Sequence, residues 1–224
     1  MAAIVLVLLA ANVGSNRVVP DALYVPWALL SAAAVLAVAL RADGRSPAEL
    51  GLGRDRVRAG LLVGGAIVAL TAAVMVIGAV VPATQDLYRD DRIEGASLAG
   101  TLFDALIRVP LGTVLLEEVA FRGALPAMVA ARTTRGMAVA VSCALFGLWH
   151  VLPAWEVASV NPSMVSLFGD AARVVPVTAG VVSTAVAGLV LWILRDRSGS
   201  LLAPALAHWA TNGLGYLIAY VIAS

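Results

Sequence analysis

The amino-acid sequence predicts an all-α fold, a polytopic bundle of about seven transmembrane helices with a polar cavity inside it. Of its 224 residues, 61% are hydrophobic and only 13% are charged, and the mean hydropathy is +0.95. No ordinary soluble domain of this size is so apolar. A few ionisable residues nevertheless lie within the apolar runs, where each is costly unless it is paired or lines a polar cavity. These residues are the first place to look for function.

Apolar runs bounded by charged or turn-forming residues predict the membrane helices, since about 20 apolar residues are needed to cross the hydrocarbon core. The seven runs are residues 2–13, 19–40, 58–81, 98–131, 136–153, 174–194 and 200–222. The first run is short, so a full span there is left open. The fourth run is too long for one span. We expect residues 98–108 to form an interfacial segment and Pro110 to begin the span.

The charges between these runs predict the orientation of the helices. Basic residues exceed acidic ones in the loop from Arg41 to Arg58 and in the turns 132–135 and 195–199. Acidic residues exceed basic ones in the loops 82–97 and 154–173. Because cytoplasmic loops carry the excess of basic residues, we expect the first three loops in the cytoplasm. Seven crossings then place the N-terminus inside and the C-terminus outside.

The chain divides into two regions by the motifs that it contains. Residues 1–97 hold about three helices, and residues 98–224 hold every candidate catalytic group. In the first region Gly60 and Gly64 are spaced four apart, which predicts a close contact with another helix.

Composition excludes several classes of protein. The single cysteine, Cys143, rules out an internal disulfide and a cysteine-based metal cluster. The net charge of +1 is spread over short loops, so no nucleic-acid partner is expected. All fifteen basic residues are arginine, which together with the high alanine content is typical of a GC-rich bacterial genome. We expect a multi-pass protein of a bacterial plasma membrane.

The most specific motif lies in the fourth apolar run, at Glu117, Glu118 and Arg122. Glu118 and Arg122 are spaced i, i+4, so their side chains share a helix face and can form an ion pair. Glu117 is rotated about 100° away and has no partner on its own helix. A carboxylate in such a site suits a general base that takes a proton from water. The alternative is that both glutamates only hold helices together through polar contacts.

The only two histidines, His150 and His208, lie in two other apolar runs. A neutral imidazole such as His150 can accept a proton, position a water molecule or bind a metal. Beside Trp149 and Trp155, His150 can equally be part of an interfacial anchor. His208 and Asn212 are spaced to share one helix face, where two hydrogen-bond donors can meet a developing oxyanion or another helix.

In order along the chain, the three motifs resemble those of the CPBP intramembrane protease family. They are Glu117-Glu118-x-x-x-Arg122, Phe146-x-x-x-His150 and His208-x-x-x-Asn212. This family includes the type II CAAX prenyl endopeptidases and the bacterial Abi proteins linked to bacteriocin processing and immunity. The resemblance covers residues 110 to about 215. Better-known members usually have eight membrane helices, and this chain is predicted to have seven.

The resemblance implies an intramembrane endopeptidase that cleaves a membrane-associated or lipidated peptide. It implies four catalytic residues, namely Glu117, His150, His208 and Asn212. The first two would activate a water molecule, and the last two would stabilise the oxyanion. Glu118 and Arg122 would be structural or would orient the substrate.

The role of a metal is left open by the sequence. Glu117, His150 and His208 have the ligand types of a catalytic zinc site with one open position. A metal-free mechanism, in which Glu117 and His150 polarise the water directly, uses the same residues. Neither the oligomeric state nor the side of substrate entry is predicted.

Two other functions compete with proteolysis. A non-catalytic immunity or scaffold protein could retain the polar core, and a small transporter could use it as a proton relay. The sequence shows no duplicated half, which disfavours the transporter. The absence of His-Glu-x-x-His and of Gly-x-Gly-Asp excludes the site-2 zinc proteases and the aspartyl intramembrane proteases.

Overall fold

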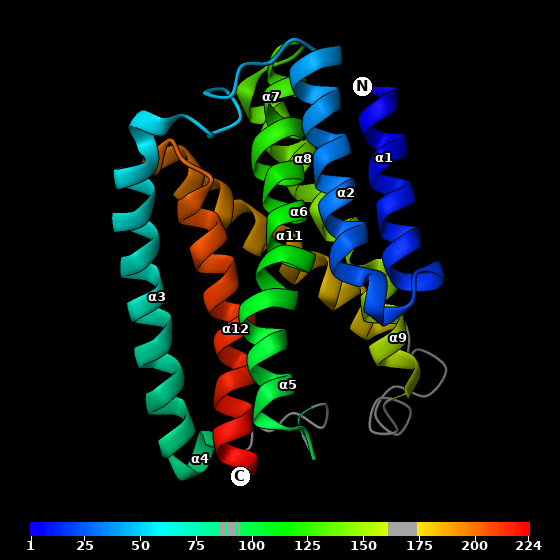
Figure 1. Cartoon of the computed structure of the whole chain (residues 1–224). Helices are drawn as coiled ribbons and strands as arrows, with labels where there is room; N and C mark the ends of the chain where they lie inside the picture. Colours follow the sequence, from blue (N-terminus) through cyan, green and yellow to red (C-terminus); the bar gives the residue numbers. More distant parts are fainter. Residues whose placement is uncertain (86–87, 89–92, 94, 161–173) are drawn as a thin grey trace.

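The computed structural model describes residues 1–85, 88, 93, 95–160 and 174–224, and every regular element in this part is a helix (Figure 1). Five described helices are long and apolar enough to cross a membrane, namely Asp21–Ala42, Arg54–Val80, Leu98–Ala130, Arg135–Trp155 and Val174–Ser198. The predicted all-α transmembrane bundle is therefore confirmed, and the protein is a multi-pass membrane protein.

The elements are labelled in chain order, with η for 3-10 and π-helical segments. They are α1 (Ala2–Val13), η1 (Gly14–Val18), η2 (Asp21–Leu23), α2 (Tyr24–Ala37), η3 (Val38–Ala42), η4 (Arg54–Arg56), α3 (Val57–Val80), α4 (Pro82–Gln85), α5 (Leu98–Phe103), η6 (Asp104–Val114), α6 (Leu115–Glu118), η7 (Val119–Ala124), α7 (Leu125–Ala130), α8 (Arg135–Trp149), α9 (Val151–Val160), α11 (Val174–Ser198) and α12 (Leu202–Ala223).

The first and last helices differ from the five long apolar ones. The helical stretch Ala2–Val18 would reach roughly 26 Å, short of the hydrocarbon core of about 30 Å. In Figure 1, α1 and its turn into α2 end near the middle of the bundle. Helix α12 has 22 residues, enough to cross, but it carries the polar residues His208, Thr211 and Asn212. Both exceptions bear on the site, because each brings polar groups into the bundle.

The region from α5 to α7 is one continuous helix, Leu98–Ala130, of 33 residues, which we call the central helix. Pro110 was expected in the first turn of the span, and this is wrong, because the helix already begins at Leu98. That residues 98–108 lie at the membrane interface stays a prediction. Pro110 lies inside the π-helical segment η6. Proline lacks an N–H and crowds the preceding turn, and the wider π turn accommodates both features without ending the helix.

The three arginine-rich loops meet at one end of the bundle, at the top of Figure 1. Arg132 pairs with Asp43, and Arg135 pairs with Asp196. The guanidinium of Arg132 holds the pKa of the Asp43 carboxyl below its usual value. The orientation predicted from the loop charges places these three loops on one side of the membrane, and the structure agrees, because they lie at one end of the bundle (Figure 1). The assignment of this end to the cytoplasm stays a prediction.

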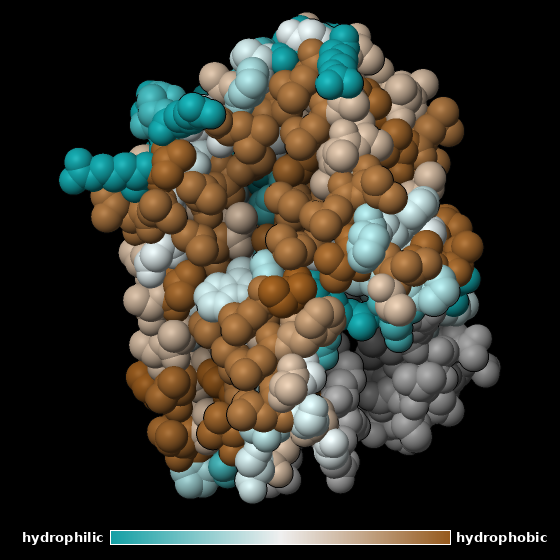
Figure 2. Space-filling view, viewed as in Figure 1, coloured by the Kyte–Doolittle hydropathy of each residue, from teal (hydrophilic) through white to brown (hydrophobic). Residues whose placement is uncertain are grey.

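The polarity of the surface is that of a protein in a lipid bilayer. Apolar side chains cover most of the face shown in Figure 2, and hydrophilic ones gather at the ends and in a patch at mid-height. Large apolar side chains along α3 and α11 are exposed, including Leu62, Leu70, Val182 and Val186. Buried polar groups lie instead between the helices, which is where a polar site is built.

Small residues bring α3 and α12 together, as the glycine spacing predicted. Gly60 and Gly64 are the buried residues of α3. A Cβ atom on Gly64 would lie 2.7 Å from Cδ1 of Leu206 and 3.1 Å from Cα of Ala203. Because α3 packs along α12, the helices of residues 1–97 and of residues 98–224 share contacts, and the division into two regions stays a prediction.

The helix after the central one breaks at His150. Helix α8 ends at Trp149, and α9 then runs to Val160. Part of the predicted loop 154–173 is therefore helical, while residues 161–173 lie outside the described part. His150 therefore lies at the junction between α8 and α9.

Candidate active site

Glu117 and Glu118 lie near the middle of the central helix, between two π-helical segments. They form the end of α6, which η6 precedes and η7 follows. Their exposed fractions are 5% and 1%. Segments of π-helix are frequent at functional sites because the wider turn redirects side chains. The local structure therefore indicates a functional site at the same two glutamates as the sequence motif does.

Glu118 is part of a buried ionic cluster. Nδ1 of His208 donates a hydrogen bond of 2.8 Å to Oε1 of Glu118. The guanidinium of Arg122 lies 3.4 Å from the same oxygen and 3.9 Å from the centre of the Phe146 ring. The predicted ion pair of Glu118 with Arg122 is confirmed. These contacts offset the cost of burying the Glu118 carboxylate.

The two oxygens of Glu117 have different surroundings. Nε1 of Trp149 donates a hydrogen bond of 2.9 Å to Oε1. Oε2 has no hydrogen-bond partner in the structure and lies 3.8 Å from Nε2 of His208. One oxygen is therefore held in place while the other can accept a proton.

A backbone carbonyl holds one ring nitrogen of His150. Its Nδ1 lies 2.8 Å from the carbonyl oxygen of Phe146. A carbonyl oxygen can only accept, so Nδ1 carries the hydrogen and the neutral ring keeps its lone pair on Nε2. The Phe146 ring also packs edge-on against the imidazole, with 4.7 Å between ring centres. These contacts fix both the orientation and the tautomer of His150.

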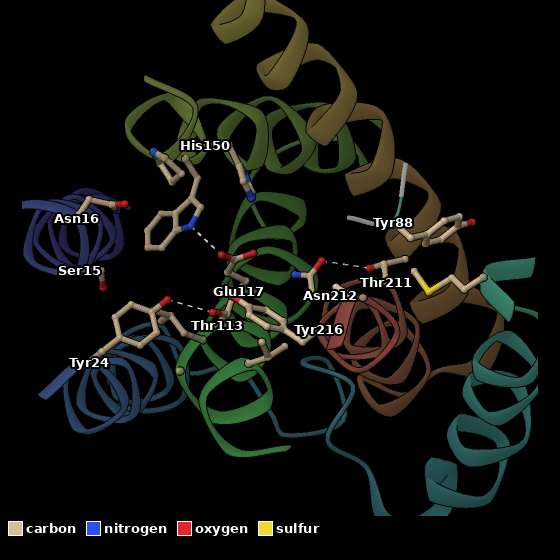
Figure 3. A pocket seen from close by; sticks show the side chains of 18 residues that line it. Ser15, Asn16, Tyr24, Tyr88, Thr113, Glu117, His150, Thr211, Asn212 and Tyr216 are labelled. Carbon is tan, nitrogen blue, oxygen red and sulfur yellow. Dashed lines mark hydrogen bonds between the residues drawn. The ribbon is translucent and has the colours of Figure 1, made fainter. Parts of the chain in front are cut away.

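A cavity of about 680 Å³ joins these groups (Figure 3). Glu117, His150, Asn212, Tyr24 and Thr113 line it, and the hydroxyl groups of the last two are joined by a hydrogen bond of 3.0 Å. This volume falls within the range of about 300–1,000 Å³ typical of ligand sites. A second hollow of about 620 Å³ shares several of its walls, namely Ser15, Asn16, Tyr24, Val109, Thr113 and Tyr216.

The structure brings all six predicted residues together, in two layers. Glu117, His150 and Asn212 line the cavity. His208, which is 7% exposed, lies behind Glu117 and links it to Glu118. The predicted role of His208 as an oxyanion donor beside Asn212 stays a prediction. Its observed contacts are with the two carboxylates.

Sequence reasoning missed several residues of this site. Trp149 was interpreted only as an interfacial neighbour of His150, yet it is a hydrogen-bond donor to Glu117. Its position next to a motif histidine was the available signal. Tyr24, Thr113 and Tyr216 also line the cavity. They lie outside any motif, so only the packing of the helices identifies them.

The described side chains do not form a ready-made metal centre. Within the described ranges, no group of three or more His, Cys, Asp or Glu side chains is placed to hold a metal ion. Nδ1 of His150 is bonded to a carbonyl and Nδ1 of His208 to Glu118, which leaves Nε2 of each ring available as a ligand. A catalytic zinc site needs three converging ligands. The predicted set of Glu117, His150 and His208 does not fit that geometry here, and zinc binding by it stays a prediction.

The candidate site is thus a buried carboxylate and an imidazole on one internal cavity of a multi-pass helical bundle. The model of one family, described as type II CAAX prenyl endopeptidase Rce1-like, matches residues 99–214. This match spans more than half of the chain and includes all six motif residues, so the chain belongs to this family. No curated protein and no solved structure matches the chain. The resemblance inferred from the motifs is confirmed, and the family supports a CAAX protease-like membrane enzyme.

Proposed function

We propose that this protein is an intramembrane endopeptidase that hydrolyses a peptide bond in a membrane-associated or lipidated peptide. The observation that carries this proposal is the state of Glu117. One of its oxygens is anchored by Trp149, and the other has no hydrogen-bond partner, in a side chain that lines the same cavity as His150.

The proposed reaction begins with a water molecule that enters the cavity between the Glu117 carboxylate and Nε2 of His150. Glu117 takes one proton from this water while the water oxygen attacks the carbonyl carbon of the scissile bond. The tetrahedral intermediate then collapses as the C–N bond breaks. The proton held by Glu117 moves to the leaving nitrogen, so the products are a carboxylic acid and an amine.

Polar groups around the attacked carbonyl would stabilise the oxyanion. Asn212 lines the cavity, and its side-chain amide is a donor that suits this role. His208 supports Glu117 from behind, 3.8 Å from Oε2. The buried cluster around His208 contains the carboxylates of Glu117 and Glu118 and the guanidinium of Arg122. A doubly protonated His208 would make this cluster neutral, which low-dielectric surroundings favour.

The substrate class follows from where the cavity lies. It is inside a bundle whose outer surface is apolar, so a substrate approaches most readily from the membrane. Its lining combines polar groups with apolar ones such as Met75, Leu116 and Pro153. A peptide that carries a lipid group has both a polar part and an apolar part to match this lining. Since the family description names prenylated CAAX peptides, a prenylated peptide is the first substrate to test.

The test is cleavage of a fluorogenic prenylated peptide by the full chain in proteoliposomes. We expect Glu117→Gln to lower kcat by at least about 100-fold, because glutamine keeps the shape of the side chain but cannot take a proton. Asp55→Asn, which removes an exposed carboxylate near α3, is the control and should cleave normally. Equal cleavage by wild type and Glu117→Gln would refute the proposed mechanism.

A further inference from the structure

A separate cavity of about 480 Å³ lies at the arginine-rich end of the bundle. The site cavity contacts the central helix between Val109 and Glu117, whereas this one contacts it from Arg122 to Ala131. Four arginines and two acidic residues line it, namely Arg45, Arg122, Arg135, Arg195, Glu49 and Asp196. We call this cavity the arginine pocket.

The arginine pocket has more positive than negative charge. Arg45 pairs with Glu49 at 3.0 Å, and Arg135 pairs with Asp196. No acidic side chain in the described part of the chain is paired with Arg195, whose guanidinium donates to the carbonyl oxygen of Glu49. Its Nε is buried without a hydrogen-bond partner. Asp43 and Glu118 lie outside the lining but pair with Arg45 and Arg122. Arg195 is therefore the lining arginine that has no acidic partner among the described side chains, and its charge favours entry of an anion.

A buried side chain at the inner wall also lacks acceptors. Arg122 is 1% exposed, and neither of its terminal nitrogens has a hydrogen-bond partner, although one lies 3.4 Å from Glu118. Leaving buried donors unsatisfied is costly, and most buried polar groups in proteins are hydrogen-bonded. The terminal nitrogens of Arg122 are buried against Glu118 and the Phe146 ring, so Arg122 contributes positive charge to the inner wall rather than a free donor. Arg195 is the residue for which an anion would supply the missing acidic partner.

The position of the pocket points to the class of anion. Guanidinium groups match the geometry of phosphate oxygens, to which they can donate two parallel hydrogen bonds. Trp192 lines the pocket and packs against Arg135, with 5.1 Å from its ring centre to the guanidinium carbon. Tryptophan and arginine at helix ends are typical of the membrane interface, and basic pockets between membrane helices bind lipid head groups.

We propose that the arginine pocket binds a phosphate group, supplied by the head group of an anionic phospholipid or by free phosphate. This proposal does not depend on the protease activity. It assigns to Arg195 a ligand that is separate from the peptide substrate.

The test is the thermal stability of the purified full chain in an uncharged detergent. Because a ligand that binds only the folded state raises its stability, phosphatidylglycerol should raise Tm by at least about 2 °C. Diacylglycerol with the same acyl chains, which lacks the phosphate, should not. Sodium phosphate against sodium chloride at equal ionic strength tests the free ion. A rise with the lipid alone identifies the head group as the source, and a rise with the salt identifies free phosphate.

Matched variants connect the effect to the pocket. We expect Arg195→Gln to lose the rise and Arg195→Lys to keep most of it. Arg197→Gln removes the same charge from the same end of α11 but lies outside the pocket, so it should respond like wild type. If Arg195→Gln does not fold, Arg45→Gln takes its place. The absence of any rise in wild type, or an equal rise in the glutamine variant of the pocket, would overturn the proposal.

Discussion

Among single residues, Trp149 has the clearest effect on the proposed general base. Its indole N–H donates to Oε1 of Glu117, while Phe121 packs edge-on against its ring at 5.5 Å between ring centres. A hydrogen bond to a carboxylate in an apolar bundle is stronger than the same bond in water. Trp149 therefore fixes the orientation of the Glu117 carboxylate at the wall of the cavity.

We predict that Trp149→Phe lowers kcat by about tenfold, because one hydrogen bond to a charged acceptor contributes about 1.5–3 kcal/mol. KM should change little, since phenylalanine keeps an aromatic ring in contact with Phe121. Tm should fall, because Oε1 of the buried Glu117 loses its hydrogen-bond donor. Trp27→Phe is the control, because it also removes one indole donor, which bonds to the carbonyl oxygen of Ala11 away from the cavity. Steady-state kinetics in proteoliposomes measure both variants. An unchanged kcat in Trp149→Phe would show that this bond has no part in catalysis.

At the scale of elements, the site depends on close contacts between helices. The central helix brings Glu117 and Glu118 between two π-helical segments, and α12 brings His208 and Asn212 to the same place. Helix α12 in turn packs along α3, where glycines permit the close approach. The position of α12 therefore depends on a helix that carries none of the motif residues.

We predict that Gly64→Leu destabilises the protein by about 1–3 kcal/mol, because the new side chain would overlap Leu206 and Ala203 of α12. Gly65→Leu is a matched control one position along, where a Cβ atom would meet nothing within 4 Å. Thermal unfolding in detergent compares the two variants. Equal Tm values for both would mean that the contact between α3 and α12 does not depend on Gly64.

At the scale of the whole molecule, two polar regions lie in one bundle with an apolar surface. The site cavity lies around the middle of the central helix, and the arginine pocket lies at the end where the basic loops meet. The cluster of Glu118, Arg122 and His208 lies between them and uses only side chains of this chain. The bundle can therefore hold its buried charges without a metal ion.

We predict that a chelator leaves the cleavage activity of the proteoliposomes within about twofold of the untreated value, since the proposed water activation uses Glu117 and His150 alone. A soluble zinc peptidase in the same vesicles serves as the positive control for chelation. Loss of activity that added zinc restores would contradict the metal-free mechanism. It would support instead the predicted ligands Glu117, His150 and His208.

Much of the fold was predictable because the protein lies in a lipid bilayer. Long apolar runs must become helices, since a lipid-exposed backbone has no other way to satisfy its hydrogen bonds. The runs at residues 58–81 and 174–194 were predicted within a few residues of α3 and α11. The central helix was not, because the usual effect of Pro110 assumes an ordinary α-helical turn. A π-helical segment depends on the packing around it and has no reliable local sequence signal.

The sequence by itself determined the class of fold, the family and the six motif residues, because burial of ionisable groups in a membrane is costly enough to mark them. Only the tertiary structure decided which groups share a surface. It showed that Trp149 anchors Glu117, that His208 joins two carboxylates, and that four arginines line a second pocket. Spacing along one helix predicts neighbours on that helix alone. Contacts between helices depend on how their side chains pack, which no single segment encodes.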